Sequence, residues 1–253
     1  MKKLSKLFFV IGGLLVTISL ISGFLGRNIW VLATDVSLIF VGVAAAINGL
    51  FFWHSKDTPS GHNFAWLGLG TGMLLLSIGT LFRLSMAGSR GVSTQVFTST
   101  DYLIVASYAL LTAGCYFFMS RAGNVMDEIE KVKIVWGIGV FFILVFDLYI
   151  AIQATEIFGK TTAGLLVNIY YVSLDLIMVL IGITYNFAFK DGKVSKFFKL
   201  VFLGIFVWAF TDIIFVLRGS YTENVSFFLT WLKILAIYLL VFAQKFYADL
   251  FTP

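Results

Sequence analysis

The chain has 253 residues, of which 60% are hydrophobic and 12% are charged, and its formal net charge is +5. Soluble domains carry about 25% charged residues, so this composition excludes a water-soluble fold and indicates a membrane protein. The single cysteine, Cys115, excludes an internal disulfide and a thiolate metal cluster. His54 and His62 share one loop, which excludes paired axial haem ligands on facing helices.

Apolar segments of about 20 residues or more recur along the whole chain, and each is predicted to cross the membrane as a helix. The eight predicted spans are residues 5–26, 30–54, 64–88, 101–121, 132–155, 164–189, 197–218 and 226–248. The first span follows Lys2, Lys3 and Lys6, as a signal peptide would, but its apolar run is longer than a signal-peptide core, so we expect it to be retained. We therefore predict an all-α, polytopic membrane protein that forms one helical bundle over residues 1–253.

Basic residues are concentrated on one side of these spans. That side comprises both termini and the connections after the second, fourth and sixth spans, and it carries Lys2, Lys3, Lys6, Lys56, Arg121, Lys131, Lys133, Lys190, Lys193, Lys196, Lys199 and Lys245. The opposite side carries Arg27, Arg90, Lys160 and Arg218. The positive-inside rule predicts that both termini are cytoplasmic in a multi-pass protein of the cytoplasmic membrane. The basic excess thus reflects topology and does not indicate nucleic-acid binding.

Several charged residues lie inside predicted spans, where burial in hydrocarbon is costly and often marks function. At about 1.5 Å per residue, they all fall in the outer half of the predicted bundle. Asp212 and Lys233 lie at similar depth on consecutive spans, so an ion pair is expected, and Trp208 is one helical turn from Asp212. The predicted ligand-binding residues are Arg83, Asp101, Asp147, Asp175, Trp208, Asp212 and Lys233.

We expect these residues to line a polar vestibule that opens to the outside. The inner half of the bundle is expected to lack polar groups and to be closed by residues such as Phe117, Phe118, Leu239 and Leu240. Carboxylates outnumber cations in the outer half, so some must be protonated, hydrated or matched by a bound cation. The alternative for Asp212 and Lys233 is that their pair only joins two helices.

The two halves of the chain resemble each other when spans one to four are aligned on spans five to eight. The alignment pairs Asp35 with Asp175, each at the start of an apolar run that ends in an Asn and aromatic residues. Since four spans restore the orientation of the chain, we predict a 4+4 parallel tandem repeat, with halves at 1–123 and 131–253.

Patterns of enzyme active sites are not found in the sequence. It contains no phosphate-binding glycine loop, no HExxH, no GxSxG and no Cys/His zinc spacing, so no catalytic residue, metal ligand or cofactor is predicted and an enzyme is not expected. Glycines inside the spans instead predict close helix contacts: Gly12, Gly13, Gly68, Gly70 and Gly72.

Three short blocks resemble the eight-span N-terminal sensor region of bacterial and archaeal signalling proteins. They are Gly79-Thr-Leu-Phe-Arg-Leu with the segment 100–114, Tyr170-Tyr-Val-Ser-Leu-Asp175-Leu, and Phe210-Thr-Asp212-Ile-Ile-Phe. The resemblance implies a membrane sensor whose family members carry histidine kinase, PAS or cyclic-di-GMP output domains. Here the sequence ends at Pro253, so we expect either a stand-alone relative that signals or assembles through a separate partner, or a resemblance that concerns architecture only.

We therefore predict a receptor-like membrane sensor that binds a small or lipophilic ligand, or a cation, in the vestibule. The expected partners are the lipid bilayer and a cytoplasmic signalling protein or membrane-complex subunit, with homo-oligomers left open. The alternatives are a transporter or ion-coupled carrier, a structural subunit of a membrane complex, and a retinal photoreceptor with Lys233 as Schiff-base amine and Asp212 as counter-ion.

Overall fold

The computed structural model describes residues 2–25, 27–56, 58–59, 61–90, 99–120, 129–157, 162–188, 192–218 and 223–251. These residues form α1 (Lys2–Ser22), α2 (Arg27–His54), α3 (His62–Arg90), α4 (Ser99–Ser120), α5 (Ile129–Ile157), α6 (Thr162–Ala188), α7 (Gly192–Arg218) and α8 (Glu223–Phe251). All eight helices are long and apolar enough to cross a membrane. The prediction of an all-α, eight-span membrane protein is confirmed, and no strand occurs in the part of the chain that the structure describes.

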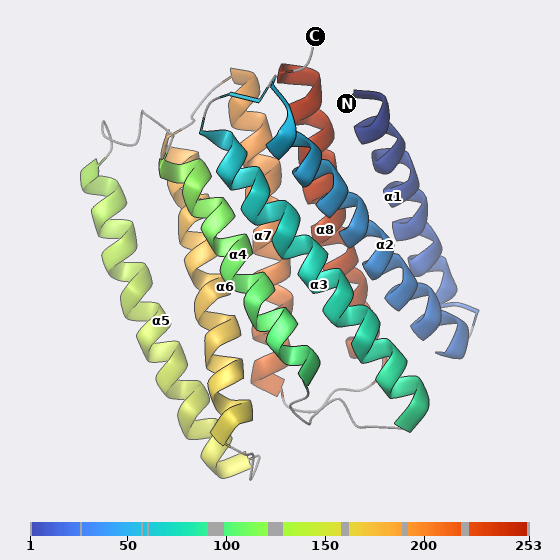
Figure 1. The fold of residues 1–253 in the computed structure, drawn as a ribbon. Coiled ribbons are helices and arrows are strands. Elements are labelled where there is room, and N and C mark those ends of the chain that lie inside the picture. Colours follow the sequence, from blue (N-terminus) through green and yellow to red (C-terminus); the bar gives the residue numbers. More distant parts are fainter. Residues whose placement is uncertain are drawn as a thin grey trace.

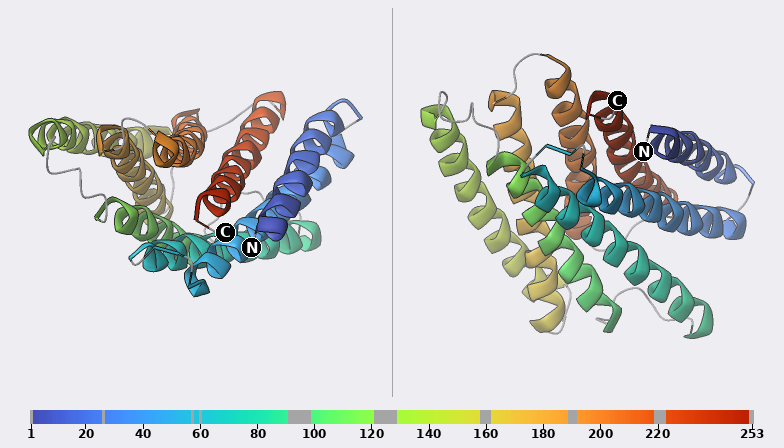
Figure 2. Two further views of the ribbon diagram at one scale, coloured as in Figure 1. Left: turned by 90° about the horizontal axis from the view of Figure 1, so that it is seen from above. Right: turned by 45° about the horizontal axis from the view of Figure 1, so that its top comes forward.

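Six of the helices form a closed ring. Each of α2, α3, α4, α6, α7 and α8 packs against the next, and α8 closes the ring on α2. α1 lies outside against α2 and α8, and α5 lies outside against α6, so these two helices occupy opposite edges of the bundle (Figures 1 and 2). The two chain ends lie together at one end of the bundle, which the basic residues predict to be the cytoplasmic end (Figure 1).

Glycines permit the closest helix contacts in the ring. A Cβ added to Gly68 of α3 would lie 2.9 Å from the Cα of Gly114 of α4, and one added to Gly114 would lie 2.8 Å from the backbone N of Leu69. The hydrophobic effect does not drive helices together within lipid. Small residues at such contacts let the backbones approach closely, so that van der Waals attraction between the helices increases. The predicted contacts are confirmed, since an added Cβ would also meet neighbouring atoms within about 3 Å at Gly12, Gly13, Gly70 and Gly72.

The order of neighbours is nearly the same in both halves of the chain. The contacts of α1 with α2, α2 with α3, and α3 with α4 recur as α5 with α6, α6 with α7, and α7 with α8. The two halves meet where α4 packs on α6 and where α8 packs on α2. The halves differ in their first helix, because α1 packs on two ring helices, α2 and α8, whereas α5 packs closely on α6 alone among the described residues. This correspondence concerns helix neighbours, and the tandem repeat stays a prediction.

The end of the bundle near the chain termini is filled by aromatic side chains. Phe118 and Leu240 are buried there as expected, whereas Phe117 is 41% exposed on the lipid side and Leu239 is half-buried. The core of this end consists of Phe52, Trp66, Phe118, Phe197, Phe198 and Tyr247.

The expectation that this inner half lacks polar groups is wrong. The Ser5 hydroxyl donates a hydrogen bond to Asn48 Oδ1 at 3.1 Å, and Gln244 Nε2 donates to the Ala45 carbonyl at 2.8 Å. Nδ1 of His62 lies 3.1 Å from the Tyr247 hydroxyl. The sequence suggested otherwise because none of these side chains carries a full charge, so a count of charged residues overlooks them.

Candidate functional site

Four helices of the ring bring polar side chains together at the same level. Tyr108 comes from α4, Asp175 from α6, Trp208 and Asp212 from α7, and Lys233 from α8. We call these five residues the central polar cluster. Trp208 and Asp212 are four residues apart, so the helical repeat places them on one face of α7. Asp175 is fully buried and Asp212 is only 7% exposed.

The ion pair between Lys233 and Asp212 is the core of the cluster. Lys233 Nζ pairs with Asp212 Oδ1, and the Tyr108 hydroxyl donates a hydrogen bond to Asp212 Oδ2. Each oxygen of this carboxylate therefore has a partner on a different helix. Trp208 Nε1 donates to the Tyr108 hydroxyl at 2.7 Å, and Lys233 Nζ lies 5.2 Å from the centroid of the Trp208 ring. A cation at that distance is also attracted to the indole face.

Asp175 supplies a second carboxyl group to the same cluster. It lies near enough to interact electrostatically with both Asp212 and Lys233. Within the described residues, both of its side-chain oxygens are buried and neither has a hydrogen-bond partner. The cluster thus holds two carboxyl groups and one ammonium group, and Lys233 interacts electrostatically with both carboxyl groups.

Aromatic rings fix the contact between α4 and α6 beside the cluster. The ring centroids of Tyr108 and Tyr171 are 4.8 Å apart, a spacing at which aromatic pairs attract each other. The Tyr170 hydroxyl donates to the Val105 carbonyl at 2.9 Å. Asp175 on α6 and Tyr108 on α4 are therefore held in a defined relation to each other.

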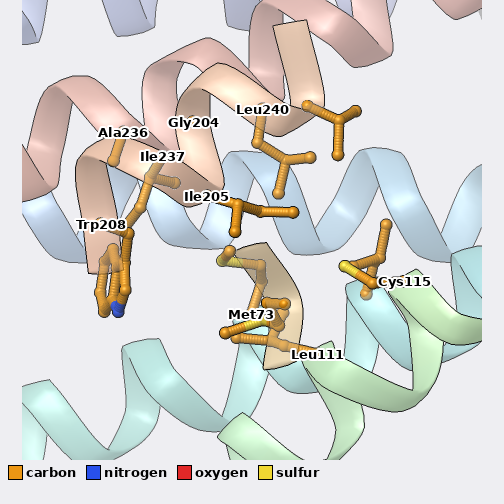
Figure 3. A pocket seen from close by; sticks show the side chains of 12 residues that line it. Met73, Leu111, Cys115, Gly204, Ile205, Trp208, Ala236, Ile237 and Leu240 are labelled. Carbon is orange, nitrogen blue, oxygen red and sulfur yellow. The ribbon is translucent and has the colours of Figure 1, made fainter. Parts of the chain in front are cut away.

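A small cavity of about 50 Å³ lies next to the cluster on the side of the chain termini. Figure 3 shows the Trp208 indole at one end of this cavity and Cys115 at the other. The lining residues come from α3, α4, α6, α7 and α8 and are otherwise apolar: Leu69, Met73, Leu111, Met178, Val201, Gly204, Ile205, Ala236, Ile237 and Leu240. The centre of the ring thus has a polar layer and, beside it, an apolar layer with unfilled space.

The structure brings together four of the predicted site residues, Asp175, Trp208, Asp212 and Lys233. Asp147 lies apart on α5, where its Oδ2 accepts a hydrogen bond from the Ser173 hydroxyl at 2.8 Å. Ser173 and Asp175 are two positions apart, so they point to different sides of α6. The side chains of Arg83 and Asp101 lie outside the described residues.

The carboxyl groups of the cluster are buried between helices, unlike the lining of an open hollow that the sequence predicted, whereas the Lys233 side chain is 21% exposed. The connections at the outer end of the bundle fall outside the described residues, so an opening to that side stays a prediction. Lys233 is absent from the lining of the small cavity, and that volume is too small for retinal without repacking. The geometry thus gives no support to the photoreceptor alternative.

Tyr108 is the member of the cluster that sequence reasoning missed. Tyrosines near span ends usually form the interfacial belt, and Tyr108 was therefore not included among the predicted ligand-binding residues. Its position did carry a signal, because Ile104, Leu111 and Cys115 lie three, four or seven residues away and mark the buried face of α4.

The fold and the cluster define a class: a multi-pass membrane protein of eight apolar helices, in which the ring of six helices holds a group of charged side chains at its centre. No protein-family model, curated protein or solved structure matches the chain. Its function is therefore argued from the geometry of the cluster.

Proposed function

We propose that this protein is a receptor-like sensor of the cytoplasmic membrane, with both termini on the cytoplasmic side. A small ligand or a cation acts at the centre of the ring, and the resulting change in helix packing is relayed to a cytoplasmic partner. One observation carries the proposal: Lys233 on α8 pairs with Asp212 on α7, and a second carboxyl group, the fully buried Asp175 on α6, interacts electrostatically with both.

The two carboxyl groups provide the two arrangements that a switch requires. In the structure Lys233 pairs with Asp212, which joins α8 to α7. A transfer of the ammonium to Asp175 would join α8 to α6 instead. Buried ion pairs are costly to break without a replacement partner, so intermediate arrangements are disfavoured and helices move between discrete states.

The blocks that resemble membrane sensor regions support this proposal. Tyr108, Asp175 and Asp212 each belong to a different block, and the three side chains meet in the central polar cluster. The short motifs behind the resemblance are thus parts of one three-dimensional group. A ligand that changes the balance of charge at this group would act on α6, α7 and α8 together.

Distances between spin labels test the switch. Cysteines introduced at the exposed positions Lys196 of α7 and Asp249 of α8 report the separation of these helices near the predicted cytoplasmic end. In lipid nanodiscs we expect Asp212→Asn, which leaves Asp175 as the acidic partner of Lys233, to shift the distance distribution. As a control, the unsubstituted chain is treated with the same spin label, to show whether the buried native cysteine, Cys115, stays unlabelled.

Asp147→Asn is the matched control, because it also removes a membrane carboxyl group but lies outside the cluster. It should leave the α7–α8 distances unchanged. One unaltered distance population in Asp212→Asn, Asp175→Asn and Lys233→Met would contradict the switch. It would favour a structural subunit in which the pair only joins helices.

A transporter is the second candidate, and the polar groups in the inner half favour it more than the sequence did. Asn48 and Gln244 are buried there, as polar groups along a path would be. Solute or proton flux into proteoliposomes distinguishes the two functions. Uptake that Asp212→Asn abolishes and Asp147→Asn preserves would replace the sensor proposal with a carrier.

A further inference from the structure

The apolar cavity beside the central polar cluster has the properties of a binding site. We propose that it takes a small apolar molecule, no larger than a gas molecule or a very short hydrocarbon, and that an occupant acts on the Lys233–Asp212 pair through Trp208. The binding itself is independent of the proposed sensor function, whereas the action on the ion pair rests on it.

The lining excludes water and polar ligands. A buried water molecule needs two to four polar partners, and dry apolar cavities bind guests such as xenon or benzene. The cavity offers the Cys115 thiol, a weak donor, and the indole N–H of Trp208, which already donates to Tyr108. An apolar guest would regain the dispersion contacts that the lining side chains now lack.

The size of the cavity limits the guest. A cavity of about 150 Å³ lined by apolar side chains accommodates benzene. The cavity here is about 50 Å³ and is bordered by buried side chains such as Leu69, Cys115 and Ile237. It therefore suits a molecule smaller than benzene.

The cavity and the cluster are successive layers of the same four helices. Each cluster residue has a cavity-lining residue three or four positions away on its own helix, and such residues share a helix face. The pairs are Tyr108 with Leu111, Asp175 with Met178, Asp212 with Trp208, and Lys233 with Ile237. A guest that displaces the lining therefore acts on all four helices that hold the charges.

Trp208 provides the most direct connection between the two layers. Its ring forms one end of the cavity (Figure 3). Its N–H donates to the Tyr108 hydroxyl, which in turn donates to Asp212. Lys233 Nζ also lies 5.2 Å from the centroid of the same ring. A tilt of the indole on binding would thus alter both the hydrogen bond to Tyr108 and the contact with the ammonium.

Xenon is the probe, and methionine methyl groups are the reporters. Met73 and Met178 line the cavity, whereas Met119 packs against the core elsewhere and serves as an internal control. In nanodiscs of protein labelled with ¹³C at the methionine methyls, we expect rising xenon pressure to shift the Met73 and Met178 signals saturably. Dissolution of xenon in lipid would give only small, non-saturating shifts in all signals.

Variants separate a site from a packing gap. Ala236→Val reduces the cavity and should abolish the saturable shifts, whereas Val145→Leu on the lipid-facing side of α5 should preserve them. Should Ala236→Val fail to fold, Leu240→Ala enlarges the cavity and should admit benzene with the same two methionines as reporters. Met73 and Met178 shifts no larger than that of Met119, with xenon and with benzene alike, would overturn the site.

The action on the ion pair has its own measurement. Xenon at saturating pressure should change the Lys196–Asp249 label distances, and the change should be absent in Trp208→Phe, which keeps an aromatic ring but lacks the N–H donor. If xenon binds saturably but the label distances do not change, the proposed action on the ion pair is wrong, whereas the binding site itself is supported. Failure of the switch itself would be seen separately, as unchanged label distances in Asp212→Asn measured without xenon.

Discussion

Asp212 is the residue on which the central polar cluster depends, because both of its carboxylate oxygens have partners on other helices. Asp175 is chemically identical and more deeply buried, yet its oxygens accept no hydrogen bond from the described donors. Removing a well-paired buried charge lowers stability, because its former partner is left buried without that interaction. Removing a carboxyl group that accepts no hydrogen bond can instead raise stability, because the cost of burying that group disappears. The two aspartates should therefore respond in opposite ways to substitution.

We predict that Asp212→Asn destabilises the protein by about 2 kcal/mol, since the ion pair with Lys233 is broken and the Tyr108 hydroxyl loses a charged acceptor, even if Asp175 becomes the new acidic partner of Lys233. Asp175→Asn should leave stability unchanged or increase it, because the new amide could donate to Asp212. Thermal unfolding measured with a thiol-reactive dye suits this chain, since its one cysteine, Cys115, is buried until the helices separate.

Asp147→Asn serves again as control and should cost about 1 kcal/mol or less, the net value of one hydrogen bond. A loss of stability in Asp175→Asn equal to that in Asp212→Asn would show that Asp175 has a partner that the cluster geometry does not include.

The residue pattern predicted most of the cluster but not its boundary. Depth along a helix follows from residue counting, which placed Asp175, Asp212 and Lys233 in the same outer half of the bundle, and Trp208 was added because it lies one helical turn from Asp212. Depth says nothing about direction around the bundle axis. Asp147 was therefore grouped with them, although α5 lies outside the ring and Asp147 faces Ser173.

At the scale of elements, α3 and α4 pack closely, backbone against backbone, at Gly68 and Gly114. An added Cβ at Gly114 would lie 2.8 Å from Leu69 N and 2.9 Å from the Ala65 carbonyl oxygen, and backbone atoms cannot move aside as a flexible side chain can. α5 shows the opposite case, with nothing within 4 Å of an added Cβ at Gly137. The same substitution should thus have opposite effects on these two helices.

We predict that Gly114→Ala destabilises the protein by about 1–3 kcal/mol through overpacking. Gly137→Ala should stabilise it by up to about 1 kcal/mol, because alanine favours the helix and meets no neighbour. The folded fraction in size-exclusion chromatography and the unfolding temperature are the measurements. Equal tolerance of both substitutions would mean that α3 and α4 are further apart than the structure shows.

The eight spans were predictable from composition, whereas their order around the ring was not. Apolar runs of about 20 residues identify spans regardless of which helices later pack together. The contact of α4 with α6 skips α5, and only packing between side chains decides such a choice. Sequence neighbours would have suggested α4 beside α5, which would have placed Asp147 nearer the cluster.

At the scale of the whole molecule, the orientation of the bundle follows from its basic residues. Phe24, in the turn between α1 and α2, is 88% exposed, and Lys56, after α2, is exposed at the opposite end. The positive-inside rule places Phe24 outside and Lys56 in the cytoplasm.

We predict that a membrane-impermeant maleimide labels Phe24→Cys in intact cells. Lys56→Cys should react only after the cells are opened, because the positive-inside rule predicts that it lies on the cytoplasmic side. Buried Cys115 in the unsubstituted chain provides the blank. The reverse pattern would invert the bundle and with it the side from which a ligand reaches the central polar cluster.

Closure of the ring joins the beginning of the chain to its end. Gln244 of α8 donates to the Ala45 carbonyl of α2 at 2.8 Å, and Trp231 donates to the Val16 carbonyl of α1 at 3.2 Å. The ribosome delivers α1 and α2 to the bilayer first and α8 last. Until α8 is inserted, the surfaces of α1 and α2 that later contact α8 are therefore covered by lipid. We therefore expect the ring to close only once α8 has been inserted, so that a chain arrested before Glu223 would present quality-control proteases with an open bundle.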